Sequence, residues 1–177
     1  MRILVNKVQG LEQRTENREQ RGDDLCVVPD SMHTYKYPRP MVTVDIFLLQ
    51  KQKGVPHVLL IQRKRDPFAG NWALPGGFVD QDEALDKAAE RELEEETGLR
   101  EMPLKQLLAA GEPGRDPRGH TISIVYGAML PDTAKIRPRA ADDAADARWF
   151  ALEKLPLLAF DHSELIRKCG DVLLPAS

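Results

Sequence analysis

The sequence predicts an α/β fold in which a mixed β-sheet lies between helices. Two observations predict it. Apolar runs of strand length flank one strongly amphipathic helical segment, and a second helical segment follows near the C-terminus. This order of strands, helix, strands and helix is typical of a sheet covered by helices. The 177 residues leave room for one domain with a core and a modest extension.

The composition is that of an ordinary globular protein, with 42% hydrophobic and 30% charged residues. A net charge of −3 gives no general attraction to nucleic acid, so we expect no nucleic-acid partner. No apolar run is long enough to span a membrane, and no apolar signal-peptide region follows Arg2, so we expect no membrane partner and a cytoplasmic location. Cys26 and Cys169 lack metal-ligand spacing and are expected to be reduced thiols without a role.

The first part of the chain differs in character from the rest. Polar residues dominate from Gln9 to Asp24, with no apolar face for a stable helix. We therefore expect residues 1–34 to form a polar arm that is partly disordered or depends on a partner. Residues 35–177 are expected to form the single folded domain.

The folded domain is expected to begin with a β-hairpin. The apolar, β-branched run 41–49 and the run 58–61 are separated by a polar turn over residues 51–54, so the two strands most simply pair with each other. The basic residues 63–65 follow as either a solvated strand end or an attractor of an anionic substrate.

A loop over residues 67–72 then leads into a glycine turn, which opens a helix within residues 77–99. Gly98 can adopt the left-handed conformation that is common at the end of a helix, and Pro103 prevents the helix from resuming.

Three further strands and a second helix are expected after Pro103. The strands are expected at residues 104–110, 121–130 and 148–150, with an exposed loop over residues 131–145. The helix is expected at residues 161–168, with Leu165 and Ile166 facing inward. His162 is expected to be a hydrogen bonder at the helix start, and His120 a residue at a strand edge.

The glutamates of the first helix fall into two groups. A helix advances by about 100° per residue, which places Glu92 and Glu96, flanked by Glu95, along the same stripe as the small apolar residues. Glu83, Glu90 and Glu94 fall on the solvent side. Carboxylates crowded along an inward face are costly unless cations compensate their charge, and hard divalent cations prefer such oxygen ligands.

The residues around this helix complete a longer pattern. It begins with Leu-Pro-Gly-Gly at residues 74–77 and resembles the signature of the Nudix hydrolases at every position. The matching residues are Gly77, Glu83, Arg91-Glu92-Leu93, Glu95-Glu96 and Gly98-Leu99, separated by five, seven, one and one residues. The resemblance implies a Nudix-type α/β/α sandwich with a mixed β-sheet between helices.

The resemblance also implies roles for these residues. Glu92, Glu95 and Glu96, with the main-chain carbonyl of Gly76, would hold two to three Mg²⁺ or Mn²⁺ ions around a diphosphate. Either Glu95 or Glu96 could also act as the general base. Family members differ on this point, so loop or strand-end acids remain alternatives, namely Asp142, Asp143, Asp146 and Glu112. Arg91 and Glu83 would hold the geometry of the ligands.

Segments outside the signature resemble the bacterial ADP-ribose pyrophosphatase branch of the family. They are residues 39–45, 115–122, 142–144, 147–149 and 160–162. Arg39, Arg115, Arg118 and Gly77 are therefore expected to bind substrate. Arg115 and Arg118 would either fork onto a phosphate or ribose or form salt bridges within their loop. Aromatic side chains either face an adenine or line the edge of the core, namely Tyr35, Tyr37 and Phe68.

The expected reaction is divalent-metal-dependent hydrolysis of a nucleoside diphosphate derivative, with ADP-ribose cleaved to AMP and ribose 5-phosphate. Two alternatives remain: hydrolysis of another nucleotide, or a sensor domain that binds ADP-ribose without cleaving it. The sensors of this branch carry a DNA-binding domain after the Nudix domain, and only 27 residues follow Phe150. Many members of the family are dimers, so a homodimer is among the assemblies that the resemblance implies.

Overall fold

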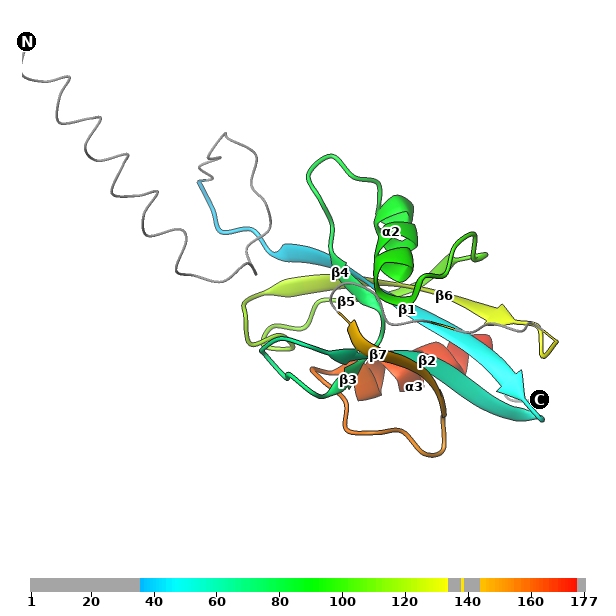
Figure 1. Cartoon of the computed structure of the whole chain (residues 1–177). Helices are drawn as coiled ribbons and strands as arrows, with labels where there is room; N and C mark the ends of the chain where they lie inside the picture. Colours follow the sequence, from blue (N-terminus) through cyan, green and yellow to red (C-terminus); the bar gives the residue numbers. More distant parts are fainter. Residues whose placement is uncertain (1–35, 134–137, 139–143, 175–177) are drawn as a thin grey trace, which may run out of the picture. The chain divides into compact units, whose positions relative to one another are not determined.

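The computed structural model describes residues 36–133, 138 and 144–174, and these residues lie in one compact unit. The predicted arm over residues 1–34 lies outside the described residues, so its boundary stays a prediction. The described part contains nine helices and strands, labelled as in Figure 1. They are β1 (Met41–Gln52), β2 (Val55–Arg63), β3 (Trp72–Ala73), β4 (Gly76–Phe78), α2 (Leu85–Thr97), β5 (Lys105–Ala110), β6 (Thr121–Leu130), β7 (Ala144–Ala151) and α3 (His162–Leu173).

The strands form one mixed sheet, as predicted. Its main path runs β3-β2-β1-β6-β5, with β4 paired to β1 and β7 paired to β2. β1 and β6 pair in parallel, whereas the other pairs are antiparallel. The predicted hairpin between β1 and β2 is confirmed. Its turn residues Lys53 and Gly54 have φ angles of 53° and 84°, as a tight two-residue hairpin turn requires.

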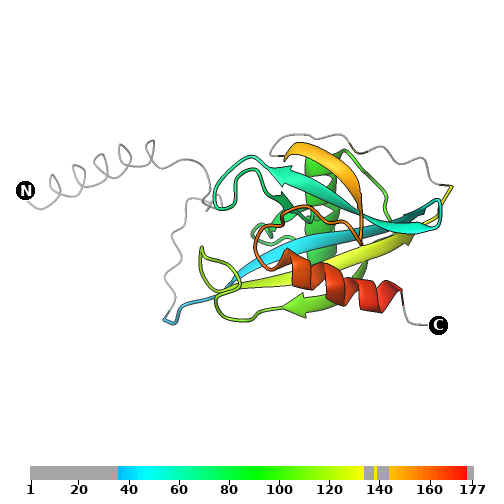
Figure 2. The same cartoon turned by 90° about the horizontal axis from the view of Figure 1, so that it is seen from below.

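The two faces of β1 belong to two different cores. Val44, Ile46 and Leu48 pack with the buried face of α2, while Phe47 and Leu49 pack with α3. This alternation follows from the strand geometry, in which successive side chains point to opposite faces. Figures 1 and 2 show α2 and α3 on opposite sides of the sheet. The α/β/α sandwich expected from the sequence is therefore confirmed.

The first helix begins later than the sequence suggested. α2 starts at Leu85, because Gly77 and Phe78 are extended in β4, paired with Val44 and Thr43 of β1. The end of the helix agrees with the prediction. Gly98 has a left-handed φ of 69°, and its N–H donates a hydrogen bond to the carbonyl of Glu94 at 2.8 Å.

The remaining elements differ from the predictions mainly at their boundaries. β3 and β4 are only two and three residues long, too short to leave a pattern in the sequence. β7 begins at Ala144, which the sequence assigned to a loop, and most of that loop lies outside the described residues. α3 continues to Leu173 instead of ending at Lys168, and Leu165 and Ile166 are buried as predicted. No helix in the described part of the chain is long and apolar enough to cross a membrane.

Candidate active site

The inward direction predicted for two glutamates of α2 is confirmed. Glu92 and Glu96 are each only 9% exposed and lie on the buried face with Ala88 and Ala89. Glu95 departs from the prediction, because its side chain is 47% exposed at the margin of this face.

Of the three glutamates predicted to face solvent, two do so and one does not. Glu90 is exposed, and Glu94 is about half exposed and paired with Arg100. The solvent assignment of Glu83 is wrong, since its side chain is only 15% exposed. Glu83 precedes the first residue of α2, so the angular argument for a helix does not apply to it.

Two glycines of β4 bring the backbone against the buried carboxylates. The N–H of Gly76 donates a hydrogen bond to Oε2 of Glu96 at 2.8 Å. A Cβ at Gly77 would lie 2.5 Å from Cδ of Glu92, and one at Gly76 would collide with the carbonyl oxygen of Val44. Gly76 also has a φ of 155°, which other residues rarely adopt. Gly77 therefore accommodates the Glu92 carboxylate only because it lacks a side chain, and Gly76 accommodates the backbone of β1 for the same reason.

Arg91 ties the helix to β4 and to the segment before the helix. Its guanidinium donates to both carboxylate oxygens of Glu83, at 2.8 and 2.9 Å, and to the carbonyl of Phe78 at 3.0 Å. It also donates to Oε1 of Glu92 at 2.7 Å and to Oε2 of Glu95 at 3.1 Å. The ion pairing predicted for Arg91 is confirmed, including its pairing with Glu83.

Burial and mutual repulsion disfavour the charged forms of the buried carboxylates. Burial raises the pKa of Glu96 to about 8; the hydrogen bond from Gly76 opposes this, and the nearby carboxylates of Glu92 and Asp45 add to it. Burial also raises the pKa of Glu92, against the hydrogen bond from Arg91. A cation between these groups would remove both the repulsion and the cost of burying their charge.

The donor set suits a hard divalent cation, because carboxylate and carbonyl oxygens are the ligands that such ions prefer. Within residues 36–133, 138 and 144–174, no three acidic, His or Cys side chains are gathered closely enough to enclose an ion. Glu92 and Glu95 instead turn toward Arg91, and Glu96 turns toward Gly76. Rotation of the first two side chains would be needed to complete a set of ligands.

A pocket adjoins the glycine strand, and it brings several predicted residues together. Gly76, Gly77, Arg115 and Arg118 all line it, whereas Arg39 and Glu112 are exposed and do not. The other lining residues come from β1, from β2, from the segment that contains β3 and β4, from the loop before β6, and from the start of α3. They are Thr43, Asp45, Ile61, Arg63, Ala73, Leu74, Phe78, Asp116, Phe160 and His162.

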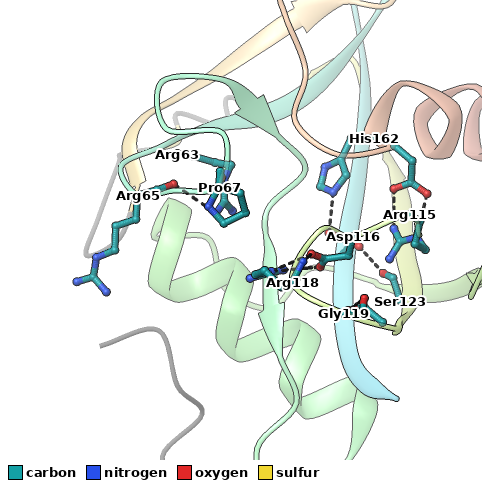
Figure 3. A network of polar contacts seen from close by, with 12 residues as sticks. Arg63, Arg65, Pro67, Arg115, Asp116, Arg118, Gly119, Ser123 and His162 are labelled. Atoms are coloured by element: carbon teal, nitrogen blue, oxygen red, sulfur yellow. Dashed lines mark hydrogen bonds and ion pairs between the residues drawn. The ribbon is translucent and has the colours of Figure 1, made fainter. Parts of the chain in front are cut away.

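Both loop arginines are already engaged with carboxylates. The side chain of Arg115 is only 6% exposed, and its guanidinium forks onto Asp161 at 2.8 and 2.7 Å. Arg118 forks onto Asp116 in the same way, with Nε donating to Oδ1 at 3.1 Å and Nη2 to Oδ2 at 2.8 Å, as Figure 3 shows. The guanidinium of Arg118 also lies 5.2 Å from the ring centre of Phe160. Two roles were left open for these arginines, contact with a phosphate or ribose and salt bridges within the protein. The structure shows the salt bridges.

The pocket also contains one buried acid that sequence reasoning missed and one histidine whose role it predicted. Asp45 is 7% exposed and accepts a hydrogen bond from the hydroxyl of Ser123. An acid within the apolar run 41–49 was the available signal. His162 was predicted to be a hydrogen bonder at a helix start, and this is confirmed: Nδ1 accepts the N–H of Leu74 at 2.9 Å.

The other candidate residues lie apart from this pocket or outside the described residues. Asp146 pairs with Arg148 on β7. Tyr37 is 68% exposed, and Phe68 packs edge to face on Phe160. His120 precedes β6 at an exposed position, as predicted. Cys169 is a buried free thiol. The candidates outside the described residues are Tyr35, Asp142 and Asp143, and Cys26, to which no role was assigned, also lies there.

Comparison with known families identifies the domain. The family model described as NUDIX domain matches residues 39–169, which is most of the chain. The chain belongs to the Nudix family. Its family signature is the segment that carries the buried carboxylates, the two glycines and Arg91.

Similar proteins include both enzymes and regulators. The chain is 46% identical to the ADP-ribose pyrophosphatase of Methanocaldococcus jannaschii, over 74% of this chain and 73% of that protein. It is 39% identical to an ADPR responsive transcriptional repressor of Acinetobacter baylyi, over 75% of this chain and 54% of the repressor. Among solved structures, the NUDIX domain of Shewanella oneidensis NrtR complexed with ADP ribose superposes with a TM-score of 0.70 at 33% identity, covering 77% of this chain and 90% of that domain.

Proposed function

We propose that this Nudix protein is a divalent-metal-dependent pyrophosphohydrolase that cleaves ADP-ribose to AMP and ribose 5-phosphate. One observation carries the proposal: the carboxylates of Glu92 and Glu96 are buried against the glycines of β4, beside a pocket. Such carboxylates are placed to hold hard cations against a diphosphate. Similarity to an ADP-ribose pyrophosphatase and to an ADP-ribose-bound domain supports the choice of substrate.

In this proposal two to three Mg²⁺ or Mn²⁺ ions would be held by Glu92, Glu95, Glu96 and the carbonyl of Gly76. Bound cations would neutralise the negative charge that shields the phosphorus atoms from attack. Arg91 supports Glu92 and Glu95 through its hydrogen bonds. Either Glu95 or Glu96 accepts the proton of the attacking water.

The arginines take different parts in the proposal. Arg118 is 31% exposed at the pocket, so it can contact a substrate while it remains paired with Asp116. Arg115 is buried and acts by holding its loop to Asp161. Arg39 and Gly77 are kept as substrate contacts. A cytoplasmic location, a homodimer and the absence of a nucleic-acid partner stay predictions from the sequence.

A sensor that binds ADP-ribose without cleaving it is the second candidate, because the chain is 39% identical to an ADPR responsive repressor. The buried carboxylates favour the enzyme, since binding alone has no need of several acids beside a diphosphate.

Product analysis tests the proposal. The protein is incubated with Mg²⁺ or Mn²⁺ and, separately, ADP-ribose, NADH, diadenosine polyphosphates and nucleoside triphosphates, and the products are resolved. We expect AMP and ribose 5-phosphate from ADP-ribose at the highest kcat/KM of the panel. Glu96→Gln should lower turnover at least about a hundredfold, while His57→Asn, on the distant β1–β2 hairpin, should leave it unchanged. No AMP from ADP-ribose would exclude the hydrolase, and retained binding without turnover would favour the sensor.

A further inference from the structure

Two buried polar residues face each other in the pocket without a hydrogen bond between them. Asp45 lies on β1, and His162 is the first residue of α3; they are 7% and 5% exposed. Nε2 of His162 is 3.6 Å from Oδ1 of Asp45, which is too long for a good hydrogen bond. Figure 3 shows the ring of His162 pointing away from α3 into the polar network.

The surroundings determine which atom of this pair is a donor. The N–H of Leu74 donates to Nδ1 of His162, so a neutral ring carries its proton on Nε2. Burial lowers the pKa of His162, which keeps the ring neutral. The other carboxylate oxygen of Asp45 accepts the hydroxyl of Ser123. The pair therefore presents one N–H donor and one carboxylate acceptor to the pocket.

The chemistry of this pair selects one kind of ligand. A hydroxyl group both accepts and donates, so it can take the hydrogen of Nε2 and give its own to Asp45. A phosphate oxygen would place a second negative charge against the carboxylate of Asp45. Three arginines line the pocket: Arg115 and Arg118 are engaged with carboxylates of the protein, and Arg63 donates to the backbone carbonyls of Pro67 and Arg65. A phosphate beside Asp45 would therefore gain less from these cations than from arginines without such partners.

We propose that the pocket binds a ribose of the substrate, with one sugar hydroxyl bridging Nε2 of His162 and Oδ1 of Asp45. The proposal rests on the proposed function, because the pocket and the buried carboxylates share Gly76 and Gly77. A diphosphate at Glu92 and Glu96 would have an attached sugar within reach of the pocket across these two glycines. A pocket that takes the terminal ribose would favour a sugar diphosphate over a nucleoside triphosphate, whose third phosphate has no sugar attached.

The experiment compares three ligands on the full chain by calorimetric titration without added metal. They are ADP-ribose, an ADP ester that carries a plain alkyl group instead of the terminal ribose, and ADP-ribose built on 2′,3′-dideoxyadenosine. The variant His162→Asn keeps an oxygen that can accept the N–H of Leu74 but loses the Nε2 donor. Asp45→Asn is the second variant and keeps the size of the side chain. His57→Asn is the control, because His57 is a partly exposed histidine far from the pocket.

We expect the unmodified protein to bind ADP-ribose about tenfold more tightly than the analogue that lacks the bridging hydroxyl. The analogue with the lower affinity identifies whether the terminal or the adenosine ribose occupies the pocket. In His162→Asn and Asp45→Asn the ratio of the affinity for ADP-ribose to the affinity for this analogue should fall close to one. In His57→Asn the ratio should stay about tenfold. Melting curves establish that each variant is folded.

Two results would overturn the assignment. One is equal affinity of the unmodified protein for all three ligands. The other is a loss in His162→Asn that is the same for all three ligands, which would make the pair a structural support only. If the ratios change as expected but ADP-ribose yields no AMP in the presence of Mg²⁺, the ribose pocket stands and the hydrolase proposal fails.

Discussion

Replacing Gly77 by alanine should separate the stability of the protein from its activity. The new Cβ would lie 2.5 Å from Cδ and 2.6 Å from Oε2 of Glu92, closer than any real contact. These atoms end a flexible side chain, so the carboxylate can rotate away. The move loses a hydrogen bond between charged groups, at a cost of about 1.5–3 kcal/mol. The lower entropy of an unfolded chain with alanine offsets about 0.4–1 kcal/mol. The free energy of unfolding should therefore fall by about 0.5–2.5 kcal/mol, or about 1–10 °C in Tm.

The activity of the same variant should fall by about 10- to 100-fold, because the Glu92 carboxylate leaves the site proposed for the cation. Release of AMP from ADP-ribose measures the activity, and urea titration measures the stability. Gly76→Ala is the matched comparison. There the Cβ meets the backbone of Val44 and lies 2.9 Å from Cα of Asp45, at a φ of 155°. Since backbone cannot rotate away, this variant should lose at least about 3 kcal/mol.

Two outcomes would refute this reasoning. A Gly77→Ala protein with the unmodified rate would show that the position of the Glu92 carboxylate does not matter for turnover. A Gly77→Ala protein as unstable as Gly76→Ala would show that the Glu92 side chain is not free to move.

Three further predictions concern the charged groups. Arg91→Lys keeps the charge but loses the forked hydrogen bonds, so kcat/KM should fall about tenfold and the free energy of unfolding by about 1–2 kcal/mol; no change in either would contradict the bracing role. Because the pKa of Glu96 is raised from 4.5 to about 8, the folded state holds a proton that the unfolded state has lost between these values. The metal-free protein should therefore lose stability as the pH rises through this window, by up to about 1.4 kcal/mol per pH unit, and urea titrations of Glu96→Gln should show a shallower slope. Asp161→Asn leaves the guanidinium of Arg115 buried without its anion and should cost about 3 kcal/mol. Asp171→Asn breaks an exposed pair and should cost about 0.5 kcal/mol or less, so equal losses in the two variants would argue against the difference in burial.

The sequence predicted best what depends on local geometry. The inward direction of Glu92 and Glu96 follows from the angle between residues of one helix, and the structure confirms it. Glu95 lies at the margin of that face, where burial depends on what packs beside the helix, and the sequence does not contain that information. The prediction that Glu83 faces solvent was wrong for a different reason: it applied the angular period of a helix to a residue that precedes the helix.

The pocket could not be predicted in the same way, because its contacts join distant parts of the chain. Arg115 and Asp161 are 46 positions apart, and the choice between a salt bridge and a substrate contact depended on that pairing. Asp45 and Ser123 are 78 positions apart, on strands whose parallel pairing leaves no local signal. Residue types could suggest candidates here, but only the folded chain shows which of them meet.

The parallel pairing of β1 with β6 also bears on how the protein folds. The long segment between β1 and β6 must close into a loop before these two strands can pair, and the entropy of closure is lost before most of the stabilising contacts form. The pairing of β1 with β6 should therefore form slowly compared with the hairpin of β1 and β2. Helix α2, with Glu92 and Glu96, lies inside that loop, and His162 comes from the helix that follows it. During synthesis, the two halves of the site would therefore meet only after α3 has left the ribosome, so that a partly made chain holds the signature helix but not the pocket.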